Sequence, residues 1–149
     1  MYSEDYVHET TALGSVQKAM ESVTSDADLA KLARSHEAKI RAAVAEAPQT
    51  PLTTLLVLAA DSVPAVRAGV ARNTRTDLPV EVRETLAQDK SIDVQFALLR
   101  CPVLPESALA KLAKSGHKEV SSVAKERVKE RKASGGAQPV FGQVGFASS

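Results

Sequence analysis

A repeat with a period of 26 to 28 residues runs through most of this chain and constrains its fold more than any other feature. Four Leu-Ala pairs recur at this spacing, and each of the four is followed at the same distance by a β-branched residue. The pairs begin at Leu32, Leu58, Leu86 and Leu112, and the β-branched residues are Ile40, Val66, Val94 and Val120. A period of this size is typical of stacked units that cannot bury their apolar faces alone. We therefore predict a repeat array.

Each unit has the pattern of two short helices. Apolar residues recur at helical spacing, and Ser, Thr or Pro stands where a helix would begin or end. Ser25 is expected to cap the first helix of the first unit, and Thr50 that of the second, ahead of Pro51. The pattern predicts an all-α fold, a short α-solenoid of about four two-helix repeats. The repeats cover residues 25–50, 51–76, 77–104 and 105–132, and the two extra residues of the third are expected to lengthen a loop.

The segments on either side of the repeats differ in composition. Residues 1–11 are polar and are expected to be flexible. Residues 12–24 have apolar positions at helical spacing and are expected to form an N-terminal cap helix, which makes 12–132 the helical repeat domain. Residues 133–149 are uncharged and Gly-rich, which predicts a disordered tail. The alternative is that Phe141 and Phe146 in this tail form a docking motif for a partner groove.

Two units share residues with a known family. They are Ile40-Arg41, Val44-Ala45, Ala47-Pro48, Thr50-Pro51, Leu55, Leu58-Ala59 and Asp61, then Val66-Arg67, Val70-Ala71, Asn73, Thr76, Leu86-Ala87 and Asp89. From residue 26 to about 130 the chain resembles the variant leucine-rich repeat. The resemblance implies a right-handed solenoid of alternating short helices, similar to HEAT repeats. The family's founding architecture also has a cysteine-rich iron-sulfur segment, and a chain with one cysteine cannot supply it.

The resemblance also suggests a structural role for four charged residues. Asp61 and Arg67 are six residues apart, the spacing at which HEAT-like units link adjacent repeats through an Asp and an Arg. By this interpretation the residues that hold neighbouring repeats together are Arg41, Arg67, Asp61 and Asp89. The alternative is that they form a row that faces a ligand.

Nothing in the sequence indicates an enzyme, a metal or a cofactor. The three histidines lie in separate segments without Cys, Asp or Glu at metal-ligand spacing, and there is no Gly-rich phosphate loop. We expect no catalytic, metal-binding or cofactor-binding residue. Cys101 is expected to be a small buried hydrophobic residue, and a reactive thiol is the alternative.

The termini and the hydropathy suggest a cytoplasmic protein. No apolar stretch approaches the roughly 20 residues that span a bilayer. The acidic N-terminus lacks the basic start and apolar run of a signal peptide. We therefore expect no membrane association. We expect a monomer, although the acidic beginning and basic end of the array leave head-to-tail assembly open.

The predicted function is a non-catalytic protein-protein interaction scaffold whose partner is another protein. The alternative is nucleic-acid binding through a basic face centred on the last helix, where interspersed glutamates and few aromatic residues argue against it. The candidate surface residues are Arg41, Arg67, Lys118, Lys125, Arg127, Lys129, Arg131 and Lys132. Such a face could also use other cations, and Arg75 is expected to be exposed. These further cations are Arg34, Lys39, Arg72, Arg75 and Arg100.

Overall fold

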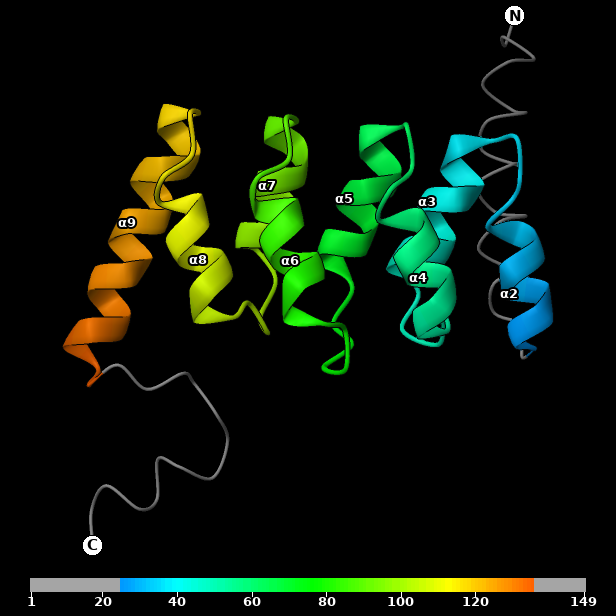
Figure 1. Cartoon of the computed structure of the whole chain (residues 1–149), viewed down its shortest axis with the longest axis horizontal. Helices are drawn as coiled ribbons and strands as arrows, with labels where there is room; N and C mark the ends of the chain where they lie inside the picture. The colour runs from blue at the N-terminus through cyan, green and yellow to red at the C-terminus, as the bar shows by residue number, and fades with distance from the viewer. Residues whose placement is uncertain (1–24, 136–149) are drawn as a thin grey trace, which may run out of the picture.

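The computed structural model describes residues 25–135, and the regular secondary structure of this part is all α-helix (Figure 1). It contains α2 (Asp26–Leu32), α3 (Ala38–Glu46), α4 (Leu52–Leu58), α5 (Pro64–Arg72), α6 (Val80–Ala87), α7 (Ile92–Leu99), α8 (Glu106–Leu112) and α9 (Lys118–Ala133). The predicted all-α fold is therefore confirmed for these residues. The predicted cap helix over 12–24 and almost all of the predicted tail lie outside the described residues.

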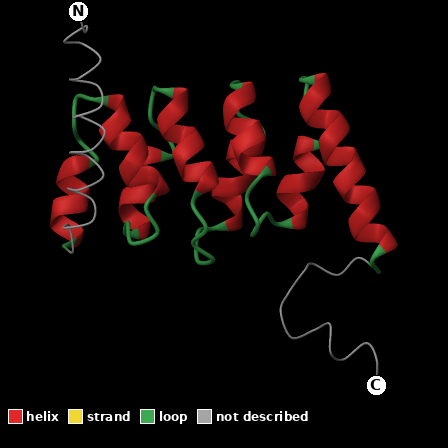
Figure 2. Ribbon diagram, turned by 180° about the vertical axis from the view of Figure 1, so that it is seen from behind, coloured by secondary structure: helices red, strands yellow, loops and turns green. Residues whose placement is uncertain are grey.

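The helices stack in pairs along one axis (Figure 2). Each pair consists of a first helix, which is α2, α4, α6 or α8, and the second helix that follows it. Within every pair the two helices contact each other, and each second helix also packs against the second helix of the next pair. This is the predicted arrangement of stacked two-helix units. No helix in residues 25–135 is both long enough and apolar enough to span a membrane.

Serine and proline mark several of the helix starts. The Ser25 hydroxyl accepts hydrogen bonds from the backbone N–H groups of Ala27 and Asp28, at 3.1 and 3.3 Å, which confirms it as a cap. The predicted cap at Thr50 is wrong. Its hydroxyl instead donates a 2.6 Å hydrogen bond to the Val44 carbonyl, and Pro51 occupies the N-cap position.

The core consists of aliphatic side chains from equivalent positions in successive repeats. Leu58, Leu86 and Leu112 are each at most 1% exposed, and the β-branched positions after them are fully buried. In the first repeat the equivalent residues, Leu32 and Ile40, are only half-buried. The first repeat therefore presents apolar surface that the later repeats bury.

Small residues allow the second helices to approach closely. A Cβ atom added to Gly69 in α5 would lie 2.8 Å from the Ala42 carbonyl oxygen and 2.9 Å from the Ala45 Cβ of α3. A glycine inside a helix costs about 1 kcal/mol relative to alanine. At this position the cost is offset because only glycine fits against α3.

The two extra residues of the third unit lie in the loop between α5 and α6, as predicted. Arg83 of α6 is 2% exposed and donates hydrogen bonds to the carbonyls of Asn73 and Arg75 in this loop, at 3.2 and 2.8 Å. The other units place Leu29, Leu55 and Leu109 at the position of Arg83. The arginine thus satisfies backbone groups that only the longer loop presents. Cys101 is buried as predicted, with its Sγ 3.1 Å from the Arg83 guanidinium.

Arg75 is half-buried, and the expectation that it is exposed is wrong. Its guanidinium pairs with Asp77 at 2.7 Å and donates to the Thr50 carbonyl of the preceding unit at 2.8 Å. The extended loop turns this side chain back over the preceding repeat, which periodicity alone does not show.

We predict that Arg75→Ala lowers the melting temperature, because the Thr50 carbonyl and Asp77 lose their partner. The measurement is thermal unfolding followed by circular dichroism. Arg34→Ala, at an exposed arginine of the first repeat, is the matched control. Equal melting temperatures for the two variants would show that the contacts of Arg75 do not stabilise the fold.

Candidate interaction surface on the second helices

Polar contacts between equivalent positions, which we call the polar ladder, join neighbouring repeats. They are Arg41–Asp61, Arg67–Asp89 and Gln95–Ser115. The Arg41 guanidinium pairs with Asp61 of the next repeat at 2.8 Å, and that of Arg67 pairs with Asp89 at 2.7 Å. At the third junction Gln95 accepts a hydrogen bond from the Ser115 hydroxyl. The contacts therefore agree with the inter-repeat interpretation of these charged residues.

The second-helix residue of each ladder contact also donates a hydrogen bond to a backbone carbonyl within its own repeat. Arg67 donates to the carbonyl of Asp61 at 2.7 Å, and Arg41 and Gln95 make the equivalent bond within their own units at 2.8 Å. The Asp61 carboxylate accepts from the backbone N–H of Val63 at 2.9 Å and so fixes the start of α5. The Arg41 and Arg67 side chains are only 16% and 18% exposed. Both guanidinium groups are occupied by protein acceptors, which leaves little of them for a ligand.

The ladder changes the acidity of its carboxylates. Burial alone would raise the pKa of Asp61 and of Asp89. The hydrogen bond from the paired arginine, a backbone N–H bond and the arginine charge together outweigh burial, so each pKa lies below its ordinary value. Both groups are therefore ionised at neutral pH.

We predict that the ladder makes the fold sensitive to acid. A carboxyl group whose pKa is lowered on folding adds stability above its unfolded pKa, about 3.9 for Asp, and this stability is lost as the pH falls through the folded pKa. The melting temperature of the wild type should therefore fall more steeply below about pH 5 than that of the double variant Asp61→Asn, Asp89→Asn. Asp28→Asn, at an exposed residue, is the control and should keep the wild-type slope. Equal slopes for the wild type and the double variant would contradict the prediction.

The cations of α9 separate into exposed and packed groups. Lys118, Lys125, Lys129 and Lys132 are exposed and lie within about 60° of one another around the helix. Glu119, Glu126 and Glu130 are exposed on a parallel stripe about 100° away. Arg127 is half-buried, and Arg131 donates to the Leu104 carbonyl at 3.0 Å. The lysines therefore form a basic stripe, whereas Arg131 packs against the loop before α8.

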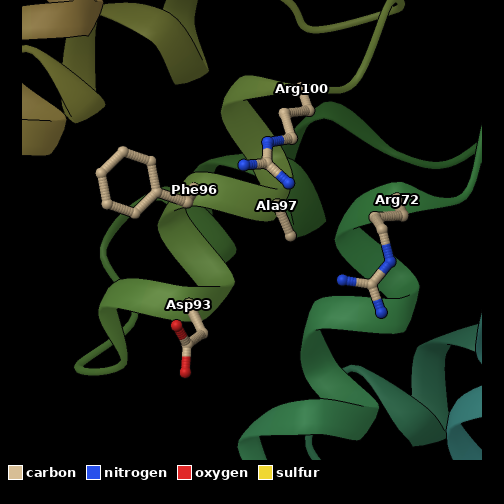
Figure 3. Close-up of a pocket in the computed structure, with 5 residues that line it drawn as sticks. All are labelled: Arg72, Asp93, Phe96, Ala97 and Arg100. Atoms are coloured by element: carbon tan, nitrogen blue, oxygen red, sulfur yellow. The ribbon is translucent and has the colours of Figure 1, made fainter.

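A shallow hollow opens between α5 and α7 on the second-helix layer (Figure 3). It has a volume of about 360 Å³ and is lined by Arg72, Asp93, Phe96, Ala97 and Arg100, which we call the α5–α7 hollow. Figure 3 shows Arg72 on α5 and Arg100 on α7, with Ala97 of α7 between them in this view. The Phe96 ring lies on the side of α7 away from α5, and Asp93 projects one turn below it. Two cations, an acid and an apolar ring thus border the hollow.

Comparison with the equivalent positions of the other repeats shows which residue of this hollow is unusual. Phe96 occupies the position that holds Ala42, Ala68 and Ser122 in the other units. It is the only aromatic residue in 25–135 and remains half-buried. Phe96 packs against the edge of the core and is larger than the residues at the equivalent positions, so part of its side chain is available to a contact surface.

Phe96 was not among the surface residues predicted from the sequence, and Arg72 and Arg100 were predicted only as general cations. The signal that would have found the hollow is the comparison of equivalent positions across the repeats, because Phe96 stands out only against Ala42 and Ala68. The structure leaves Arg41 and Arg67 in the ladder and the α9 lysines on a separate helix. It does not bring the predicted surface residues together.

Two further predictions concern other kinds of site. Phe141 and Phe146, the predicted docking motif, lie outside the described residues. Within residues 25–135, no group of three or more His, Cys, Asp or Glu side chains is placed to hold a metal ion.

Comparisons with known proteins add no relative. No protein-family model matches the sequence, no curated protein matches it, and no solved structure matches the fold.

Proposed function

We propose that this chain is a non-catalytic scaffold of the variant leucine-rich, HEAT-like repeat type that binds another protein through its second-helix layer. The observation that supports the proposal is Phe96, a half-buried aromatic residue where equivalent positions carry small side chains. Proteins recognise one another through a few apolar and arginine anchors surrounded by weaker contacts. The α5–α7 hollow combines an aromatic residue with two arginines. We further propose that the protein acts as a monomer in the cytoplasm.

The alternative, nucleic-acid binding, has one observation in its favour. The basic stripe on α9 has four exposed lysines, and phosphate neutralisation needs cations on one face. The parallel glutamate stripe argues against nucleic-acid binding, because the negative charge of the glutamates repels phosphates bound to the neighbouring lysines. The ladder also uses Arg41 and Arg67, which removes two of the proposed contacts.

A pull-down from native cell extract distinguishes the two functions. Tagged wild-type protein is compared with Phe96→Ala, with and without nuclease, and bound proteins and nucleic acid are both quantified. Val57→Ala is the matched control, because Val57 is an apolar residue on α4 that is 71% exposed. We expect a discrete protein that survives nuclease, remains with Val57→Ala and is lost with Phe96→Ala. Recovery of nucleic acid, with co-purifying proteins lost on digestion, would overturn the scaffold proposal.

A further inference from the structure

We propose that the α5–α7 hollow recognises an acidic peptide segment, in which a Glu or Asp carboxylate stands next to an apolar side chain. This inference rests on the proposed scaffold function and names the chemistry of its partner. The carboxylate binds between Arg72 and Arg100, above Ala97, and the apolar side chain packs against Phe96.

The two arginines of the hollow differ from those of the ladder. Arg41 and Arg67 are held by carboxylates that are themselves 12% and 10% exposed, and each also donates to a carbonyl. Among residues 25–135, Arg72 pairs only with Glu46, at 3.2 Å, and the two side chains are 41% and 52% exposed. Exposed pairs of this kind contribute little, so a partner carboxylate can replace Glu46 at small cost.

Arg100 has no side-chain hydrogen bond or ion pair with any described residue, and it is exposed. Its guanidinium keeps all five donors for a ligand. Arg72 and Arg100 occupy equivalent positions on neighbouring second helices, and both line the hollow. Two guanidinium groups so placed suit a carboxylate, which accepts paired hydrogen bonds from arginine.

Apolar surface beside the arginines indicates that the residue next to the carboxylate in the peptide is apolar. Gly69 faces Ala42 and Ala45 of the preceding second helix. Val123 of α9 takes the position of Gly69 in the repeat, and α9 packs against α7. Val123 is 41% exposed and adds apolar surface on the helix next to Phe96. A partner with an apolar residue next to its acid buries both side chains.

The acid at the edge of the hollow favours a peptide over a nucleic acid. Asp93 lines the same hollow as the two arginines, and a run of phosphates would lie against its carboxylate. A peptide needs to supply only one carboxylate, and its backbone N–H groups can donate to Asp93. A single aromatic residue also offers little for base stacking.

The test is selection of a random peptide library displayed on phage against the full chain, followed by fluorescence anisotropy of the selected peptides. We expect selected peptides to be enriched in Glu or Asp beside Leu, Ile, Val or Phe. Each of Arg72→Ala, Arg100→Ala and Phe96→Ala should weaken binding by about tenfold, the effect of losing one charge-assisted hydrogen bond or one apolar anchor. Arg34→Ala removes an exposed arginine elsewhere and should bind as the wild type does. Arg100→Glu should weaken acidic peptides further.

The possible results separate this inference from the function on which it rests. Selected peptides without acidic residues that still depend on Phe96 would overturn the acidic motif and leave the scaffold standing. Peptides whose binding is unchanged in Arg100→Ala would overturn the site. A single-stranded oligonucleotide of twenty thymidines that binds more tightly than any peptide, and loses affinity in Arg100→Ala, would overturn both in favour of nucleic acid. Thermal unfolding of each variant verifies that it folds.

Discussion

Gly69→Leu should lower the free energy of unfolding by about 3 kcal/mol, the upper part of the range for overpacked sites. The new side chain would start 2.8 Å from the Ala42 carbonyl oxygen, which belongs to the backbone of α3 and cannot rotate away. The helices α3 and α5 must therefore separate, and every contact between the first two repeats weakens. Urea unfolding at pH 7 gives the free energy directly.

Gly116→Ala is the control, because a Cβ atom at Gly116 meets nothing within 4 Å. Gly69→Ala is an informative intermediate. In an open helix this change stabilises by up to about 1 kcal/mol through helix propensity, whereas here the close approach should reverse the sign. A stabilised Gly69→Ala variant would show that α3 and α5 are not packed as closely as the structure has them.

Leu58→Ala is the second large expected effect, a loss of about 2 to 5 kcal/mol. Leu58 is 1% exposed, and its removal leaves a cavity in the middle of the array, where repeats on both sides restrict collapse. Its neighbour Val57 is 71% exposed, so Val57→Ala should change stability by less than about 0.5 kcal/mol. Urea unfolding of both variants measures the difference. Similar losses at the two positions would mean that the repeat is assigned in the wrong register.

Periodicity predicted the parts of the fold that every unit repeats. Leu58 and Val66 were assigned to the core because their equivalents recur, and both are buried. The family resemblance assigned Asp61, Asp89 and the two arginines to inter-repeat contacts, but the ion pairs are Arg41–Asp61 and Arg67–Asp89 rather than Asp61–Arg67. Recurring positions are predictable because each unit packs against its neighbours in the same way.

Positions governed by loops and helix ends were predicted less well. Thr50 has a good capping sequence, but the preceding helix supplies an acceptor for its hydroxyl. Leu56 is apolar but 42% exposed, because a helix of seven residues buries only one stripe. The hollow depends on how α5 and α7 are spaced, and a linear sequence does not contain that distance.

The polar ladder has a mechanical consequence. Its first two junctions are ion pairs, and its third, between Gln95 and Ser115, joins two uncharged groups. The force needed to separate neighbouring repeats should therefore differ along the axis, and it should be lowest at the junction before α8 and α9. Under a stretching force the array should yield there first, which lets the last repeat swing as a hinged end while the hollow between α5 and α7 keeps its shape.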